Sequence, residues 1–160
     1  MHILKDIFSN HMILAPVVAW AVAQLIKIII CLISEKKLVM KLIVSDGGMP
    51  SAHSATVISL AVMCGWTQGF DSAAFAIGII MAVVIMRDAV GVSYDTGVNA
   101  RVIKHLADRE NAKFSEGDEP IDAKGLKLIA GHTPMQVACG CVVGVAVCIL
   151  YILIGNIPMA

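Results

Sequence analysis

The sequence predicts an all-α membrane protein: a polytopic helix bundle with about four transmembrane helices and one further amphipathic helix at the membrane interface. Of its 160 residues, 58% are hydrophobic and only 15% are charged. Soluble domains are roughly half apolar and about a quarter charged. The mean hydropathy of +0.84 is that of a bilayer protein, and the apolar residues form runs close to the roughly 20 residues that cross a hydrocarbon core.

Four apolar segments are the expected spans, and they form one integral membrane domain over residues 1–160. The first segment is interrupted only by Gln24 and Lys27. The second is short for a bilayer unless the preceding "GGMPSAH" enters the protein interior. The expected boundaries are about 12–33, 51–66, 72–92 and 134–154.

The third and fourth spans are separated by one long polar stretch, residues 93–127. In its first part, apolar residues recur at helical intervals, which predicts the amphipathic interfacial helix. Its second part, "ENAKFSEGDEPIDAKG", is acidic and contains glycine and proline, which predicts a loop. We interpret the acidic side chains of this loop as solvated rather than as a metal site: Glu116, Asp118, Glu119 and Asp122.

The remaining composition excludes several function classes. The five cysteines lie in or beside apolar runs without a CxxC pair, so we interpret them as reduced packing residues. No nucleotide-binding loop, redox motif or nucleic-acid-binding patch is visible, and we expect no cofactor and no nucleic-acid partner. The glycine pairs of "GWTQG" and "GCVVG" allow close helix packing. Packing within one chain explains them, and the sequence leaves open whether a homo-oligomer forms.

Basic residues are distributed unevenly across the expected topology. The side reached by the end of the first span receives ten of them, against Lys5 alone on the other side. The positive-inside rule therefore places this side in the cytoplasm and both termini outside. The ten are Lys36, Lys37, Lys41, Arg87, Arg101, Lys104, Arg109, Lys113, Lys124 and Lys127.

Three polar motifs must meet at this same membrane face, although they are far apart in the sequence: "GGMPSAH", "RDAVG" and "GHTP". Two of them open a helix and carry a histidine, His53 and His132. Helix N-termini attract anions, Ser51 is a natural N-cap, and a glycine such as Gly48 lets the backbone approach a ligand. The pattern predicts an anion site, and phosphate is the natural anion beside lysine and arginine.

These residues resemble a known family. "PSAH" followed far downstream by "GHTPMQVACG" is similar to the type 2 phosphatidic acid phosphatase and vanadium haloperoxidase superfamily, and "RDAVGV" adds a likeness to its divergent membrane branch of small bacterial and plastid proteins. The resemblance implies that His132 attacks phosphorus and forms a phosphohistidine. It implies that His53 protonates the leaving alkoxide. It also implies that Ser51 and the backbone amides around Ala52 hold the phosphate oxygens.

The sequence departs from the superfamily pattern at several positions. Gln136 replaces the aspartate that orients the nucleophile, and Leu126 replaces an arginine. Gln136 can still accept the imidazole N–H, and Asp88 is a candidate source of the missing charge. The opening lysine–arginine–proline motif has no recognisable counterpart, and we favour Arg87 and Lys27 as substitutes for its phosphate-binding cations.

Two hypotheses follow for the function. The first is a phosphatase of the membrane, hydrolysing a phosphomonoester or diphosphate of a phospholipid or isoprenoid at the cytoplasmic face of a bacterial plasma membrane. The second is a catalytically silent protein that binds an anionic lipid head group or assists transport. His53 and His132 favour the first, whereas Gln136 and Leu126 favour the second.

Overall fold

The computed structural model describes residues 2–35, 48–113, 121–123, 125–126 and 130–160. Every regular element in these ranges is helical, which confirms the predicted all-α membrane bundle. The helices are α1 (His2–Phe8), α2 (His11–Glu35), α4 (Ala52–Gln68), α5 (Ala73–Val90), α6 (Val92–Asn111) and α7 (Pro134–Gly155). The predicted span boundaries agree with these helices to within two residues. The acidic cluster at 116–119 and the lysines at 36, 37, 41, 124 and 127 lie outside the described residues.

Local capping chemistry fixes where three helices begin. The hydroxyl of Ser51 accepts from the amide of Ser54, and the hydroxyl of Ser72 accepts from the amide of Phe75. Thr133 caps α7 in the same way, with Pro134 at the first helical position. Each hydroxyl satisfies an amide that has no intrahelical acceptor, so these starts follow from short stretches of sequence.

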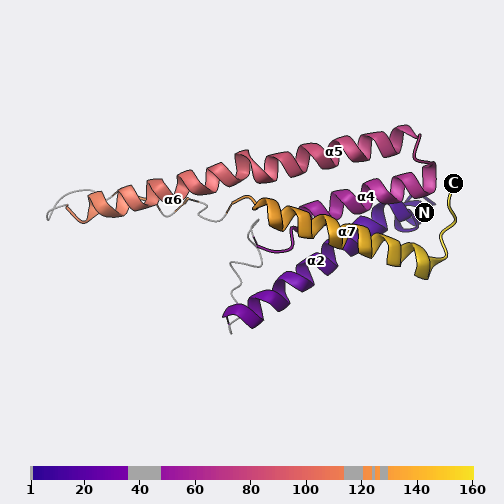
Figure 1. Ribbon diagram of the computed structural model, residues 1–160, viewed down its shortest axis with the longest axis horizontal. Coiled ribbons are helices and arrows are strands. Elements are labelled where there is room, and N and C mark those ends of the chain that lie inside the picture. Colours follow the sequence, from indigo (N-terminus) through magenta and orange to yellow (C-terminus); the bar gives the residue numbers. More distant parts are fainter. Residues whose placement is uncertain (1, 36–47, 114–120, 124, 127–129) are drawn as a thin grey trace.

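The bundle is built around α4, which packs against α2, α5 and α7 (Figure 1). Small residues allow these helices to approach closely. A Cβ added at Gly78 of α5 would lie 3.0 Å from the backbone of Ala61, and one added at Gly144 of α7 would lie 2.5 Å from the carbonyl oxygen of Ala55. Such van der Waals packing is one of the forces that hold helices together in a membrane, because the surrounding lipid removes the hydrophobic drive for association.

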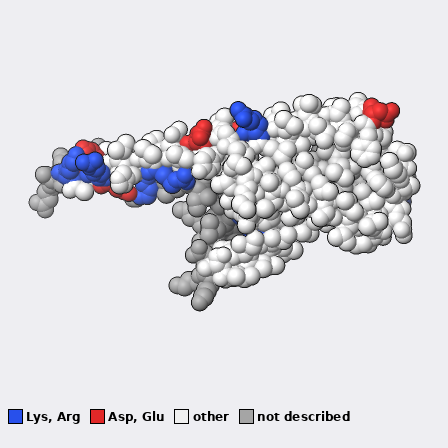
Figure 2. All heavy atoms as spheres, viewed as in Figure 1, with Lys and Arg blue, Asp and Glu red and all other residues white. Residues whose placement is uncertain are grey.

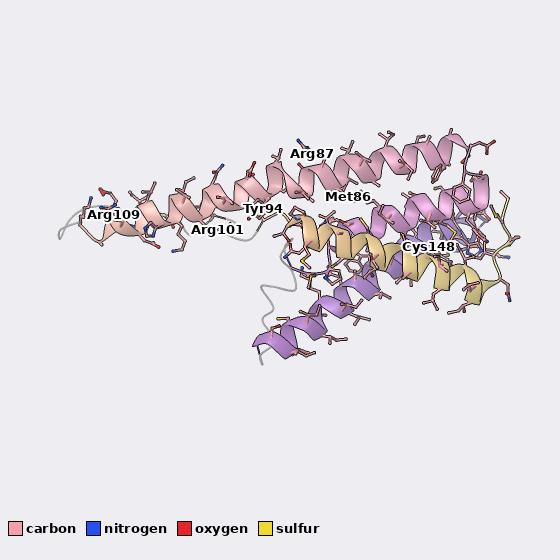
Figure 3. All side chains as sticks on the ribbon, viewed as in Figure 1. Met86, Arg87, Tyr94, Arg101, Arg109 and Cys148 are labelled. Atoms are coloured by element: carbon pink, nitrogen blue, oxygen red, sulfur yellow. The ribbon has the colours of Figure 1, made fainter. Side chains whose placement is uncertain are left out.

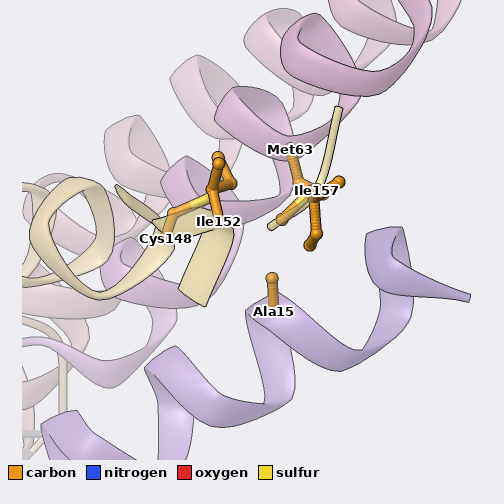
Figure 4. Packing of buried hydrophobic residues seen from close by; sticks show 5 residues of the cluster. All are labelled: Ala15, Met63, Cys148, Ile152 and Ile157. Atoms are coloured by element: carbon orange, nitrogen blue, oxygen red, sulfur yellow. The ribbon is translucent and has the colours of Figure 1, made fainter. Parts of the chain in front are cut away.

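One end of the bundle has a compact apolar core, made of Ala15, Met63, Cys148, Ile152 and Ile157 (Figure 4). The C-terminal tail closes this end. The indole of Trp66 donates to the carbonyl oxygen of Ile157 at 2.9 Å, and the amide of Ala160 donates to the carbonyl oxygen of Trp66 at 2.9 Å. Both chain termini lie at this end (Figure 1), opposite the end where α2 finishes and α7 begins.

Three helices in the described residues are long and apolar enough to cross a membrane: α2, the continuous α5–α6 rod, and α7. Charges flank an uncharged band on the face seen in Figure 2. Along α5 this band extends from Asp71 to Arg87, about 24 Å at 1.5 Å per residue, close to a hydrocarbon core. The remaining expected span, residues 51–66, corresponds to α4, which has 17 residues in the centre of the bundle. Its crossing of the membrane stays a prediction.

The predicted amphipathic helix is present as α6, and it begins at Val92 rather than near Gly97. Only Gly91 separates it from α5, and α6 continues in nearly the same direction beyond the bundle (Figure 1). Large apolar side chains on it are exposed, among them Val102, Ile103 and Leu106. This helix continues along the line of α5 and does not turn across the end of the bundle (Figure 1). Its contact with the membrane surface stays a prediction.

Candidate functional site

His132 is held at the point where α5 meets α6. Its backbone amide donates to the carbonyl oxygen of Ala89 at 2.8 Å, and its side chain is buried. The preceding Gly131 has a φ of +72°, and a Cβ there would collide with the backbone of Tyr94. Only glycine combines this conformation with so close an approach. The segment before α7 is therefore packed onto the α5–α6 junction, and it carries His132 with it.

His53 reaches the same place from the second position of α4. The amide of Ser51 donates to the carbonyl oxygen of Gln136 at 3.1 Å, which ties the start of α4 to the start of α7. Gly140 leaves room for this approach, since a Cβ there would collide with the carbonyl oxygen of Ser51. The two imidazole rings consequently lie edge to face, with centroids 6.1 Å apart and an interplanar angle of 76°.

A cavity of about 390 Å³ lies beside the two histidines. Its walls come from all three motifs that we expected to meet at this face, and the prediction of their convergence is confirmed. The lining residues are His53, Ile85, Asp88, Ala89, Val92, Ser93, Thr96, Ala130, Gly131 and His132. No lysine or arginine is among the described lining residues, and within the described ranges no group of three His, Cys, Asp or Glu side chains is placed to hold a metal ion.

Asp88 faces this cavity from the end of α5. Its carboxylate accepts a 2.8 Å hydrogen bond from the hydroxyl of Ser93. Among the described residues, Asp88 takes part in no ion pair. The carboxylate therefore keeps accepting capacity toward the cavity, since it offers about four lone-pair sites.

Gln136 has a structural task at the start of α7. Its side-chain oxygen accepts from the amide of Thr133 at 3.0 Å, while its own amide donates to the hydroxyl of Thr133 at 3.4 Å. This is a capping box. Gln136 does not line the cavity, and the bond expected from the His132 imidazole to its amide oxygen stays a prediction. The spacing "TPMQ" matches the S/T-x-x-E/Q pattern, so the capping role of Gln136 was readable from the sequence.

Ser51 and Ala52 lie at the N-terminus of α4, outside the lining of the cavity. Ser51 is fully buried, and its hydroxyl accepts from both the amide and the hydroxyl of Ser54. The amides of Ala52 and His53 precede the first intrahelical bond of α4, which runs from Ala55 to Ser51. They are the backbone groups left to a ligand at this helix end.

The structure separates the two cations that we favoured for phosphate. Lys27 is buried on α2, and its side chain runs over Gly48, where a Cβ would come within 2.7 Å of the lysine Cε. This contact brings Lys27 to the segment that precedes α4. Arg87 is exposed and points away from the other helices (Figure 3). Neither residue lines the cavity.

Two cavity residues, Ser93 and Thr96, were missed by sequence reasoning. The hydroxyl of Ser93 donates to Asp88, and the hydroxyl of Thr96 donates to the carbonyl oxygen of Val92 at 2.7 Å. Both lie in the first turns of α6, where the amphipathic pattern had not yet started. The available signal was helical spacing, because Asp88, Ser93 and Thr96 lie on one face of a helix that continues past Gly91.

The chain matches the Divergent PAP2 family over residues 8–147. It is also 36% identical over 146 residues to the uncharacterized membrane protein YuiD of Bacillus subtilis, covering 88% of this chain and 92% of that protein. No solved structure matches it. The family match spans most of the chain and includes all three motifs of the cavity, and the protein therefore belongs to the Divergent PAP2 family.

Proposed function

We propose that the protein is a membrane phosphatase that hydrolyses a lipid phosphate through a phosphohistidine intermediate. The observation that carries this proposal is the pairing of His53 with His132, from the starts of two different helices, beside one cavity. Phosphoryl transfer needs a nucleophile, an acid for the leaving group and an electropositive frame for the phosphate oxygens. Membership of a phosphatase-like family agrees with this chemistry.

In the proposed reaction a ring nitrogen of His132 attacks phosphorus, and the bond from phosphorus to the lipid oxygen breaks. His53 gives its proton to that oxygen, so that the lipid leaves as an alcohol. Water, deprotonated by His53, then attacks the phosphohistidine and releases inorganic phosphate. The amides of Ala52 and His53 at the start of α4, with Lys27 nearby, are the proposed contacts of the phosphate oxygens.

The position of the cavity suits a substrate that stays in the bilayer. It lies where α5 ends and α7 begins, at the level of the charged residues that flank the uncharged band. A lipid with its tail beside the apolar helices would present its head group at this depth. The lysine and arginine asymmetry supports the cytoplasmic face of a bacterial plasma membrane.

The direct test uses the full chain purified in detergent and a panel of phospholipid and isoprenoid phosphates. We expect release of inorganic phosphate, and a labelled protein adduct that survives base and is lost in acid, as a phosphoramidate is. His132→Ala should abolish both signals. An active protein that forms no adduct at His132 would contradict the proposed route.

The second candidate is a silent protein that binds an anionic head group. Gln136 favours this candidate. Its side-chain oxygen caps α7, and it supplies no carboxylate to stabilise an imidazolium at His132. Loss of the comparable carboxylate in serine proteases costs about 10⁴ in rate. A folded wild type that binds phosphate or vanadate, releases none from any lipid and stays inactive as Gln136→Asp would support this candidate over the phosphatase.

A further inference from the structure

The cavity has two chemically different walls. One wall carries the imidazoles of His53 and His132, and the other carries Asp88, Ser93 and Thr96 from the α5–α6 junction. A phosphate accounts for the first wall only. A phosphate dianion gains nothing from a carboxylate in the same cavity, because like charges repel.

Both hydroxyl protons on the second wall are committed to neighbouring groups. Ser93 donates to the Asp88 carboxylate at 2.8 Å, and Thr96 donates to the carbonyl oxygen of Val92 at 2.7 Å. Each hydroxyl oxygen can therefore only accept a further bond, and the carboxylate is an acceptor already. The nearby cation Arg87 is directed away from the bundle (Figure 3). The wall presents three acceptors and one negative charge.

We propose that the cavity binds a zwitterionic phosphate, in which a primary ammonium group is a few bonds away from phosphorus. The ammonium has three N–H donors and no acceptor, which matches Asp88, Ser93 and Thr96, while the phosphate lies against the histidines. The volume of about 390 Å³ is that of a small-molecule site. The histidine half of this assignment rests on the proposed function, whereas the ammonium half rests on the second wall alone.

The experiment measures binding rather than turnover, using three soluble probes: phosphoethanolamine, ethyl phosphate, which lacks the ammonium, and phosphocholine, whose trimethylammonium has no N–H donor. Calorimetry on the full chain in detergent should show phosphoethanolamine binding about fivefold more tightly than ethyl phosphate, as expected for an exposed ion pair. It should also bind more tightly than phosphocholine, which offers no N–H to the three acceptors. Because the advantage over ethyl phosphate is ionic, that preference should shrink as salt is raised.

Two matched variants locate the preference. Asp88→Asn keeps an acceptor for Ser93 but removes the charge, and it should bind phosphoethanolamine and ethyl phosphate equally. Asp95→Asn removes the same charge from the first turn of α6, outside the cavity lining, and should keep the wild-type preference. Circular dichroism establishes that both variants fold.

Equal binding of phosphoethanolamine and ethyl phosphate by the wild type would overturn the proposal, whether or not the protein is a phosphatase. So would an unchanged preference in Asp88→Asn. Binding of ethyl phosphate that tightens with added Mg²⁺ to at least the level of phosphoethanolamine, and weakens with a chelator, would overturn the proposal and assign the second wall to a metal ion instead. If the protein lacks phosphatase activity but its preference for phosphoethanolamine depends on Asp88, this inference stands and the proposed function fails.

Discussion

The backbone amide of His132 donates a 2.8 Å hydrogen bond to the carbonyl oxygen of Ala89. The last carbonyls of a helix have no intrahelical partner, and here the end of α5 supplies one to the segment that opens α7. The position of His132 is consequently set by a helix distant in sequence. Residues without any chemical role should therefore control the site through this junction.

Gly131→Ala should damage the site without removing any reactive group. Its φ of +72° disfavours alanine, and the added Cβ would collide with the backbone of Tyr94, so His132 must move. A displacement of about 1 Å can cost about 10²-fold in rate. Gly125→Ala is the matched control, since nothing lies within 4 Å of a Cβ there. Equal phosphatase rates in the two variants would show that the junction does not position His132.

The two histidines should respond differently to the leaving group. His132→Ala removes the attacking nitrogen and should abolish turnover of every substrate. His53→Ala removes the proton donor, so hydrolysis of a lipid phosphate should slow by about 10²–10⁴-fold, and hydrolysis of p-nitrophenyl phosphate should slow much less. His105→Ala, on the exposed face of α6, should match the wild type. Equal losses on good and poor leaving groups would remove the acid role of His53.

Gln136 should matter first for stability. Gln136→Ala breaks the bond to the Thr133 amide, and a lost cap interaction costs about 1 kcal/mol. Gln136→Glu keeps the capping box and should unfold at the wild-type temperature or above it, because a negative charge is favourable at a helix N-terminus. Thermal unfolding in detergent compares the two variants. Equal melting temperatures of Gln136→Ala and the wild type would show that the capping bond does not contribute to stability.

Gln136→Asp tests the missing carboxylate separately. It introduces the aspartate of the superfamily pattern four residues after His132. The rate should rise if an imidazolium partner is limiting, since a nearby negative charge stabilises the protonated ring. The shorter side chain also weakens the cap, so rate is measured per folded protein. A gain in Gln136→Glu as large as in Gln136→Asp would point to charge alone rather than to orientation of the ring.

The orientation in the membrane has a direct test with single cysteines in a background lacking the five native ones. Ala112→Cys, exposed at the end of α6, should react with a membrane-impermeant maleimide only after the cells are opened. Ala160→Cys, at the exposed C-terminus, should react in intact cells. Labelling of Ala112→Cys from outside would reverse the topology and place the cavity outside the cytoplasm.

Most of the architecture could be predicted because its causes are local. The length of an apolar run determines whether it can cross a bilayer, and caps such as Ser51 and Thr133 mark helix starts by bonds to residues three positions away. Helices that run alternately in opposite directions along the bundle then bring "GGMPSAH", "RDAVG" and "GHTP" together at one end of it. The sequence alone therefore determined the helical membrane bundle and the meeting of the motifs that carry its two histidines.

The direction in which each side chain points was decided only by the tertiary structure. Arg87 and Asp88 are neighbours in sequence, but successive residues on a helix point about 100° apart, and the packing of α5 on α4 turns Asp88 to the cavity and Arg87 away from it. Ser93 and Thr96 reached the cavity because α6 continues α5 past Gly91. Rotation about a helix axis depends on the neighbours against which the helix packs, and a single sequence does not specify those neighbours.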